Sequence, residues 1–364
     1  MDKCYKFIEK SDSVFTFSYF CLRFYKKEVM LQFIKNWTLP LAMLAGVIGY
    51  FFFSSFGWTD PVKPAVRQLM AWLTPILIFL QLFLTFCKVE VKDLSPRPWV
   101  WWLLGFQLLS CLAVSAVLIV GVTDSYLRIL LEGVMVCLIC PTATAAAVVT
   151  GKLGGSAAAL TTYTLLSNLL AAVAVPLLFP LIEASDISFL MAFGRILRKV
   201  FPLLLLPFVM AWLCRRWLPV LHRWVVARKD LAFYLWAVAL VIVMGQTTES
   251  VIEGDTSLTQ ECGIAFLALL ACVIQFVVGK QVGGMYADRI SAGQALGQKN
   301  TVLAIWMACT YLNPASAIAP GSYVLWQNVI NSWQLWKKRV KDSREAMSTM
   351  KMAPTLSAIS LMRL

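Results

Sequence analysis

Long apolar stretches separated by short polar segments dominate this sequence. A helix needs about 20 mostly apolar residues to cross the hydrocarbon core of a bilayer. By that measure the pattern predicts ten spans, over residues 37–56, 65–87, 99–121, 126–150, 156–182, 200–215, 231–248, 262–280, 289–311 and 314–334. Each should be helical, because a lone segment in lipid satisfies its backbone hydrogen bonds only as a helix. We therefore expect an all-α polytopic membrane protein.

Composition agrees with this class and argues against others. Of the 364 residues, 60% are hydrophobic and only 14% are charged, which is too apolar for an ordinary soluble domain. The net charge of +13 does not indicate a nucleic-acid partner, because the lysines and arginines are confined to a few connecting segments. The ten cysteines lack metal-ligand spacing, and the single histidine, His222, lies in a basic loop. We expect no enzyme activity, no metal site and no cofactor.

The basic segments predict how the chain enters the membrane. Lysines and arginines precede the first span, follow the second and sixth, and return after the tenth, whereas the loop after the seventh span is acidic. By the positive-inside rule, an N-terminal segment 1–36 and a C-terminal tail 337–364 should both be cytoplasmic. Three basic residues between 195 and 199 fall on the outer side and do not fit. We expect 187–199 to form an amphipathic helix lying at the interface.

Ten spans divide into two groups of five, over residues 37–182 and 187–336. Because five is odd, a duplicated second half enters the membrane in the opposite direction, as in the inverted repeats of secondary transporters. The fourth span of each half carries helix-breaking residues, which are Pro141 in the first half and Gly293 with Gly297 in the second. Paired interruptions point to a binding site near the membrane centre. Alternatively, they are kinks and close-packing positions.

Three motifs carry a family resemblance. They are Cys140-Pro141-Thr142-Ala143-Thr144-Ala145-Ala146-Ala147-Val148-Val149-Thr150, Gly297-Gln298-Lys299-Asn300, and Ala319-Pro320-Gly321 followed by Trp326-Gln327-Asn328. Together they resemble the bile acid:sodium symporter family over most of residues 37–336. The resemblance implies ten transmembrane helices as two inverted five-helix repeats, arranged as a panel domain and a core domain. The broken fourth and ninth helices would cross near the membrane midplane.

The same resemblance implies a function. Members of the family move organic anions, typically bile acids, steroid conjugates or small carboxylates, by alternating access coupled to sodium. A divergent bacterial-type member would lie in the bacterial inner (plasma) membrane. The partners to expect are a small organic anion and the lipid bilayer, with protons as a further candidate.

The sodium ligands are where this chain departs from the family pattern. The family's ninth helix carries a glutamate and a glutamine where this chain has Ala295 and Lys299. A Ser-Asn pair in the broken fourth helix is replaced by Ala146 and Ala147. Because a hard cation needs several oxygen ligands, the residues that remain are too few to cage sodium.

Lys299 itself is an anomaly in an apolar segment. A charge near the bilayer centre costs about 2.5–3.5 kcal/mol on insertion scales, so it usually faces a cavity, a partner or a pathway. Our hypothesis is that Lys299 supplies the positive charge that sodium supplies elsewhere. If it stays charged, the protein is a uniporter or anion exchanger in which Lys299 pairs with the substrate carboxylate. If it loses and regains a proton in each cycle, transport is coupled to protons.

Alternatives to this hypothesis stay open. Lys299 could instead snorkel to an interface, as long basic side chains do near helix ends. The protein could be a sodium-coupled anion symporter with degenerate sites. It could also be a transporter-like receptor that binds without translocating, since an intramembrane enzyme would need a catalytic constellation that this sequence does not show at depth.

Seven further polar residues complete the expected substrate and coupling site. By resemblance, Gln107 matches a glutamine of the third helix and Thr161, or Thr164, a hydroxyl of the fifth. Other candidates come from the residues themselves: Thr142 and Thr144 after the proline break, where half-helix amides could hold an anion, and Gln294, Gln298 and Asn300 around Lys299. Helix capping and packing are the alternative roles for these two groups.

Three polar residues in the apolar spans receive no site role. Glu132 could be a coupling carboxylate, but pairing with Arg128 four residues earlier is the favoured interpretation. Gln246 and Gln275 are isolated polar positions in apolar helices.

Overall fold

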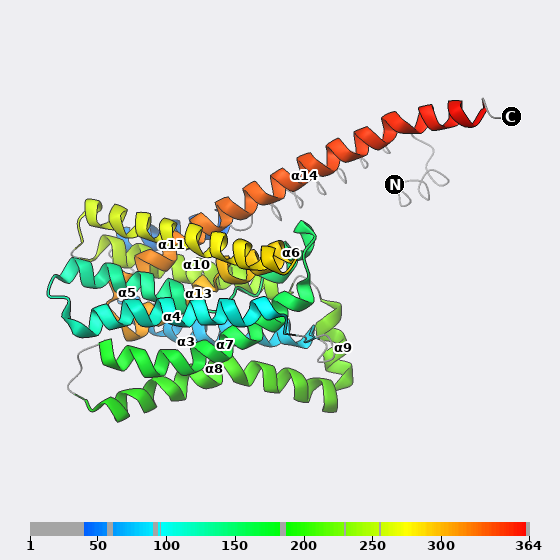
Figure 1. Cartoon of the computed structure of the whole chain (residues 1–364). Helices are drawn as coiled ribbons and strands as arrows, with labels where there is room; N and C mark the ends of the chain where they lie inside the picture. Colours follow the sequence, from blue (N-terminus) through cyan, green and yellow to red (C-terminus); the bar gives the residue numbers. More distant parts are fainter. Residues whose placement is uncertain are drawn as a thin grey trace, which may run out of the picture.

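The computed structural model describes residues 40–56, 61–89, 94, 96–182, 187–228, 231–254 and 256–361 of the chain. The regular structure in these ranges is helical, apart from one isolated bridge between extended residues (Figure 1). The all-α prediction is therefore confirmed for the described part, and the predicted N-terminal segment 1–36 lies outside it.

Helices in the first half lie close to the predicted spans. They are Pro40–Ser55, α3 (Lys63–Cys87), α4 (Pro98–Gly121), α5 (Ser125–Ile139), α6 (Ala146–Leu153) and α7 (Ala157–Ile182). Both α3 and α4 begin with proline in the first turn, where the missing N–H would have no helical partner. The carboxylate of Asp124 caps α5 by accepting the N–H of Leu127 at 2.6 Å.

The second half is also helical. Its helices are α8 (Phe189–Trp217), α9 (Pro219–Ala227), α10 (Leu231–Ile252), α11 (Leu258–Met285), α12 (Arg289–Gly297), α13 (Thr301–Tyr311), the 3-10 turn η3 (Pro314–Ala317) and α14 (Ile318–Leu361). A reciprocal capping box between Ser257 and Gln260 starts α11.

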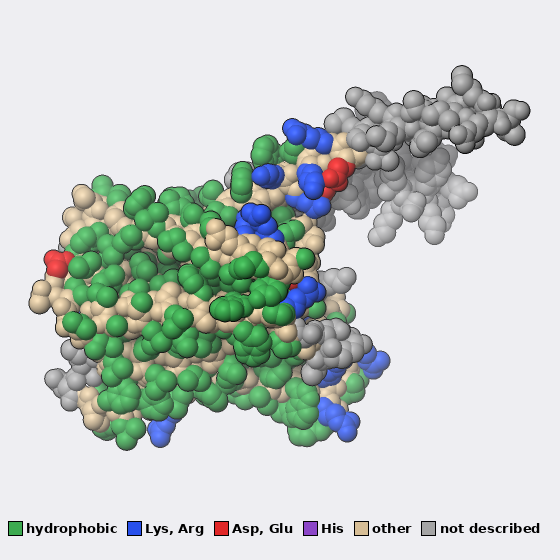
Figure 2. Space-filling view, in the orientation of Figure 1, with side chains coloured by type: hydrophobic (Ala, Val, Ile, Leu, Met, Phe, Trp, Pro, Cys, Tyr) green, Lys and Arg blue, Asp and Glu red, His purple; other side chains and the backbone are tan. Residues whose placement is uncertain are grey.

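Several of these helices have the length and the apolar composition needed to cross a bilayer. Six of the described helices are long and apolar enough by themselves, and they lie within α3, α4, α7, α8, α10 and α11. The helices Pro40–Ser55 and Thr301–Tyr311 are shorter but also apolar. The chain is thus an integral membrane protein, and hydrophobic side chains are spread over the face of the bundle seen in Figure 2.

Two boundaries were predicted wrongly. Residues 187–199 do not form a separate interfacial helix, because α8 runs unbroken from Phe189 to Trp217. Pro202 and Pro207 lie inside α8 without ending it, since neighbouring groups in a membrane protein can satisfy the backbone that proline frees.

The second error concerns the end of the chain. The helix of the tenth span does not end near residue 334, because α14 continues to Leu361 as the long helix that leaves the bundle in Figure 1. Helix-forming residues and the i,i+4 ion pairs Lys338–Asp342 and Lys341–Glu345 support this extension.

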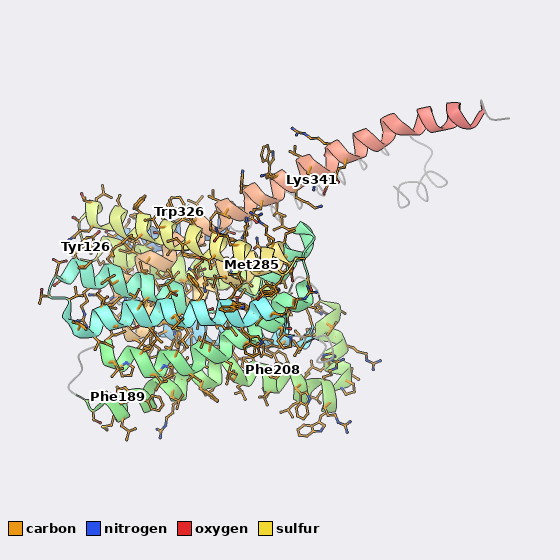
Figure 3. The ribbon with its side chains drawn as sticks, in the orientation of Figure 1. Tyr126, Phe189, Phe208, Met285, Trp326 and Lys341 are labelled. Carbon is orange, nitrogen blue, oxygen red and sulfur yellow. The ribbon has the colours of Figure 1, made fainter. Side chains whose placement is uncertain are left out.

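The helices can be grouped by packing into two neighbourhoods, which are joined chiefly where α7 packs against α8. Helix α3 contacts α8 and α10, whereas α11 contacts α12, α14 and α5, and α4 contacts α5 and α7. In Figure 3, Tyr126 at the start of α5 and Phe189 at the start of α8 lie at one end of the bundle. Met285, at the end of α11, lies toward the other end, from which α14 leaves. The two interrupted helix pairs, α5 with α6 and α12 with α13, belong to the second neighbourhood.

Candidate functional site

Two helix breaks are the starting point of the site. In the first half α5 ends at Ile139, just before Pro141, and α6 starts at Ala146. In the second half α12 ends at Gly297 and α13 starts at Thr301, with the Asn300 side chain accepting the N–H of Leu303 at 3.3 Å as its N-cap. Both breaks agree with the predicted interruptions.

Gly293 does not lie at the second break, as the sequence had suggested. It sits inside α12, where a Cβ atom would come within 2.6 Å of the Lys280 side chain. Its small size permits close packing, whereas the break itself falls on residues 298–300.

The two breaks meet each other through their backbones. Thr142 and Lys299 form an antiparallel bridge. The N–H of Ala143 donates to the carbonyl of Gln298 at 2.9 Å, and the N–H of Asn300 donates to the carbonyl of Pro141 at 2.8 Å. These bonds satisfy backbone groups that the broken helices leave open, which is necessary inside a membrane.

Lys299 is held at this contact and is shielded from solvent. Its side chain is only 1% exposed, and Nζ donates to the carbonyl of Leu138 at 3.2 Å. Its backbone is fixed by Gln327, whose Oε1 accepts the Lys299 N–H at 2.9 Å and whose Nε2 donates to the Lys299 carbonyl at 3.4 Å. Within the described residues Lys299 forms no ion pair. Snorkelling to an interface is therefore not what this structure shows.

The charge of Lys299 lies at the C-terminal end of α5. Carbonyls at a helix end lack helical donors and carry a partial negative charge. Here three side chains supply the donors: Lys299 to Leu138, Gln107 Nε2 to Ile139 at 2.8 Å, and Gln275 Nε2 to Cys137 at 3.5 Å. The end of α5 thus acts as the counter-charge that a carboxylate would otherwise provide.

Two tyrosines extend this network. The hydroxyl of Tyr163 donates to Oε1 of Gln107 at 2.8 Å and orients its amide. The hydroxyl of Tyr323 accepts from Gln275 at 3.2 Å and donates to the Gly297 carbonyl at the end of α12 at 2.9 Å. Sequence reasoning gave Gln275 no role and missed Tyr163 and Tyr323, because an isolated polar residue in an apolar helix gives no indication of its partner.

The positions that would carry sodium ligands in the family are apolar here. Ala146 and Ala295 are both fully buried. They belong to one hydrophobic cluster, which includes Leu160 and Tyr163, and Ala147 packs against it. Neither substituted position therefore offers a side-chain oxygen, and both are packed in a mainly apolar cluster.

The three threonines expected in the site differ in burial and in hydrogen-bond partners. Thr142 is buried, and its hydroxyl donates to the Ala295 carbonyl at 2.6 Å, so it ties the two breaks together. Thr144 is half-buried beside it. The Thr161 hydroxyl bonds to Ala157 within its own helix at 2.8 Å.

The two expected glutamines near Lys299 lie in α12 and in the break that follows it. Gln294 of α12 donates to Oε1 of Gln334 on α14 at 3.4 Å. Oε1 of Gln294 and Oε1 of Gln298, the first residue of the break, are buried and have no hydrogen-bond partner among the described residues.

Glu132 has a structural role. It pairs with Arg128 at 3.1 Å and accepts the N–H of Asn313 at 3.2 Å. The favoured interpretation of this carboxylate, pairing with Arg128, is confirmed.

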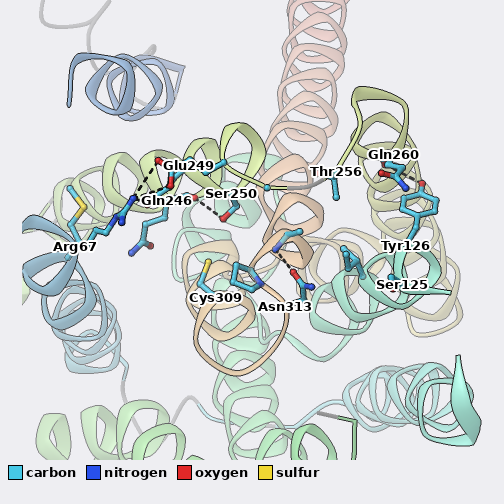
Figure 4. A pocket seen from close by; sticks show the side chains of 16 residues that line it. Arg67, Ser125, Tyr126, Gln246, Glu249, Ser250, Thr256, Gln260, Cys309 and Asn313 are labelled. Atoms are coloured by element: carbon cyan, nitrogen blue, oxygen red, sulfur yellow. Dashed lines mark hydrogen bonds and ion pairs between the residues drawn. The ribbon is translucent and has the colours of Figure 1, made fainter. Parts of the chain in front are cut away.

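A cavity of about 720 Å³ opens between the two helix neighbourhoods at the end where α5 begins (Figure 4). One wall carries Arg67 of α3, paired with Glu249 at 2.5 Å and Glu253 at 3.1 Å, both on α10. The opposite wall has uncharged polar groups, including Ser125, Tyr126, Gln260 and Asn313. Its volume is within the range of small-molecule sites.

Comparison with known proteins identifies a family and a relative that this chain resembles. The model of the SBF-like CPA transporter family matches residues 41–335. The chain is also 23% identical over 326 residues to the "Uncharacterized sodium-dependent transporter YocS" of Bacillus subtilis (strain 168). That alignment covers 84% of this chain and 91% of the relative.

Proposed function

The chain belongs to the SBF-like CPA transporter family, and from this premise we propose that it is a sodium-independent secondary transporter of organic anions. It works by alternating access, and Lys299 occupies the role that a bound sodium ion has in the bile acid:sodium symporters that the chain resembles. Membership of the family makes it a membrane transporter. The anion, the coupling and the topology are our proposals.

The proposed topology has ten spans. The six long apolar helices, the helix Pro40–Ser55, the broken pairs α5/α6 and α12/α13, and the first part of α14 supply them. Two inverted repeats, 37–182 and 187–336, would each contribute one broken helix. The panel domain would contain Pro40–Ser55, α3, α8 and α10, and the core domain the rest. Both termini, with the tail 337–364, would lie in the cytoplasm.

Sodium independence is supported chiefly by the position of the Lys299 ammonium at the end of α5. In secondary transporters, C-terminal ends of half-helices and unwound carbonyls are the groups that coordinate a coupling cation. Nζ of Lys299 already occupies such a position, 3.2 Å from the Leu138 carbonyl. The substitutions at Ala146 and Ala295 add to this, because the side chains at these two positions carry no oxygen that could bind a cation.

The cavity in Figure 4 is the proposed substrate site of an outward-facing state. It lies between α3 and α10 on one side and α5, α13 and η3 on the other, so rocking of the two neighbourhoods would close it. Lys299 does not line it. In this state Lys299 therefore does not pair with the substrate. Its role is to supply a positive charge inside the core domain.

Two coupling modes are consistent with a buried lysine. A permanently charged Lys299 gives a uniporter or an exchanger, whereas a lysine that releases its proton in each cycle gives proton coupling. Uptake that responds to an imposed pH gradient and acidifies the vesicle lumen would identify the second mode. Uptake indifferent to the gradient would identify the first.

Counterflow in sodium-free proteoliposomes tests the proposed function. Vesicles loaded with an unlabelled bile acid, steroid sulfate or short monocarboxylate are diluted into the labelled compound with choline as the only monovalent cation. Transient accumulation of label is expected for at least one anion. Saturable binding without accumulation would indicate a receptor, and accumulation that appears only with sodium would indicate a degenerate sodium symporter. Either result overturns the proposal.

A further inference from the structure

Three cations from three helices converge where α14 leaves the bundle. Lys280 lies near the end of α11, Arg289 is the first residue of α12, and Lys337 lies on α14. The Lys280 side chain lies against Gly293, one turn after Arg289 on α12, and Gln294 of α12 donates to Gln334, one turn before Lys337 on α14. We call these three residues the basic cluster. It lies at the end of the molecule that we propose faces the cytoplasm.

The basic cluster has no acidic partner within the described residues. Asp288 is buried and is already paired with Arg97 at 3.2 Å, and it accepts a hydrogen bond from Trp99. The acids of the α14 extension, Asp342 and Glu345, pair with Lys338 and Lys341 instead. Like charges that are close together repel, so no acidic group among the described residues balances the cluster.

Behind the cluster lies a floor of amide side chains. The Lys280 side chain crosses α12 at Gly293, where a Cβ would meet it at 2.6 Å. The next residue, Gln294, donates to Gln334, whose own Nε2 is buried without a partner. Asn331, one turn earlier on α14, is also buried, and both of its amide atoms lack partners. Buried amide groups without partners are costly, so these groups call for a partner from outside the described residues.

The surroundings place this cluster at the level of lipid headgroups. Trp333 and Trp336 are 52% and 58% exposed on α14, and Met285 is 72% exposed at the end of α11. Tryptophan prefers the boundary between headgroups and acyl chains. The Lys337 ammonium lies 5.2 Å from the Trp333 ring centre and so shares its depth. Figure 2 shows Lys and Arg side chains gathered where α14 leaves the apolar surface, and Figure 3 marks Met285 and Lys341 on either side of that point.

We propose that Lys280, Arg289 and Lys337 bind the phosphate headgroup of an acidic phospholipid, whose acyl chains lie against the exposed Trp333, Trp336 and Met285. Basic residues beside a membrane helix are attracted to the negative surface of the cytoplasmic leaflet. A phosphate accepts hydrogen bonds from all three cations, and Nε2 of Gln334 is a further donor close by. The headgroup ties α12, which leads to Lys299, to α11 and α14.

Native mass spectrometry of the full chain tests this site. The protein is purified from mixed phosphatidylcholine and phosphatidylglycerol, and the retained lipids are counted for the native protein and for the variant K280Q/R289Q/K337Q. One basic residue near an anionic surface contributes about a fivefold change in affinity. Loss of all three should therefore lower phosphatidylglycerol retention by about a hundredfold, with phosphatidylcholine unchanged.

The matched control removes the same number of positive charges from neighbouring positions on α14. In K338Q/R339Q/K341Q two of the three residues already have acidic partners at i+4, so phosphatidylglycerol retention should fall less than about fivefold. Equal losses in the two variants would show a diffuse charge effect and overturn the site. The thermal midpoint in pure phosphatidylcholine should be the same for all three proteins, which excludes misfolding as the cause.

A free anion is distinguished from a lipid by competition. Inorganic phosphate and glycerol phosphate at millimolar concentration should not displace phosphatidylglycerol from the native protein. Displacement by either, or equal stabilisation by either in phosphatidylcholine, would show a site for a soluble anion and overturn the lipid assignment. None of these measurements depends on transport, so they can fail while the proposed function stands.

Discussion

Replacing Lys299 by methionine separates charge from shape at the centre of the site. Methionine is similar in length, but it removes the ammonium that donates to Leu138 at 3.2 Å. Two favourable terms are lost: a hydrogen bond from a charged group, worth about 1.5–3 kcal/mol, and attraction to the end of α5, worth up to about 2 kcal/mol. One unfavourable term is also lost, since desolvating a buried charge costs several kcal/mol.

These terms nearly cancel, so Lys299→Met should fold. We expect the free energy of unfolding to change by less than about 2 kcal/mol, and the thermal midpoint in detergent by less than about 6 °C. Anion counterflow, in contrast, should fall to the level of protein-free vesicles. The variant lacks the positive charge that, in our proposal, takes the place of bound sodium during transport. An exposed lysine, Lys341→Met, serves as the control and should leave both quantities nearly unchanged.

Two results would refute this reasoning. Counterflow at the native rate in Lys299→Met would show that the charge has no part in transport. A loss of more than about 4 kcal/mol in stability would show that Lys299 is mainly a structural link between the two breaks. Such a loss would mean that the interactions of the ammonium outweigh its desolvation cost by far, whereas we expect the two to nearly cancel.

Three further predictions concern the same region. Gln327→Leu removes both hydrogen bonds to the Lys299 backbone and should lower the free energy of unfolding by about 1–3 kcal/mol in thermal denaturation. Unchanged stability would show that these hydrogen bonds from α14 do not stabilise the break. Gly297→Ala would place a Cβ 2.4 Å from an aromatic ring of α11 and should cost about 1–3 kcal/mol, whereas Gly105→Ala, which has open space, should cost nothing. In the double variant A295E/K299Q, sodium should raise the thermal midpoint; a double variant indifferent to sodium would show that the oxygens missing around Ala146 matter as much.

The positions of the helices and of the two helix breaks could be predicted from the sequence. Apolar runs and Pro141 predicted the spans and the first break, because both depend on local chemistry. Lys299 could be recognised as anomalous without a structure, since a charge in an apolar segment is costly wherever it faces.

The partners of these residues could not be predicted in the same way. Lys299 contacts Leu138 and Gln327, which lie far from it along the chain, and hydrophobic periodicity does not indicate which helix faces which. The continuous α8 was missed because proline usually ends a helix in water, and the helical extension of α14 was missed because the sequence there has no clear hydrophobic periodicity.

Sodium titration of the purified protein tests the central claim most directly, because it needs no knowledge of the substrate. The thermal midpoint is measured in detergent as sodium replaces choline at constant ionic strength. A ligand at a hundredfold excess over its dissociation constant stabilises the native state by about 2.7 kcal/mol. If Lys299 takes the place of sodium, the midpoint should not move at any sodium concentration. A saturable rise of several degrees would show that a sodium site exists and would contradict the account.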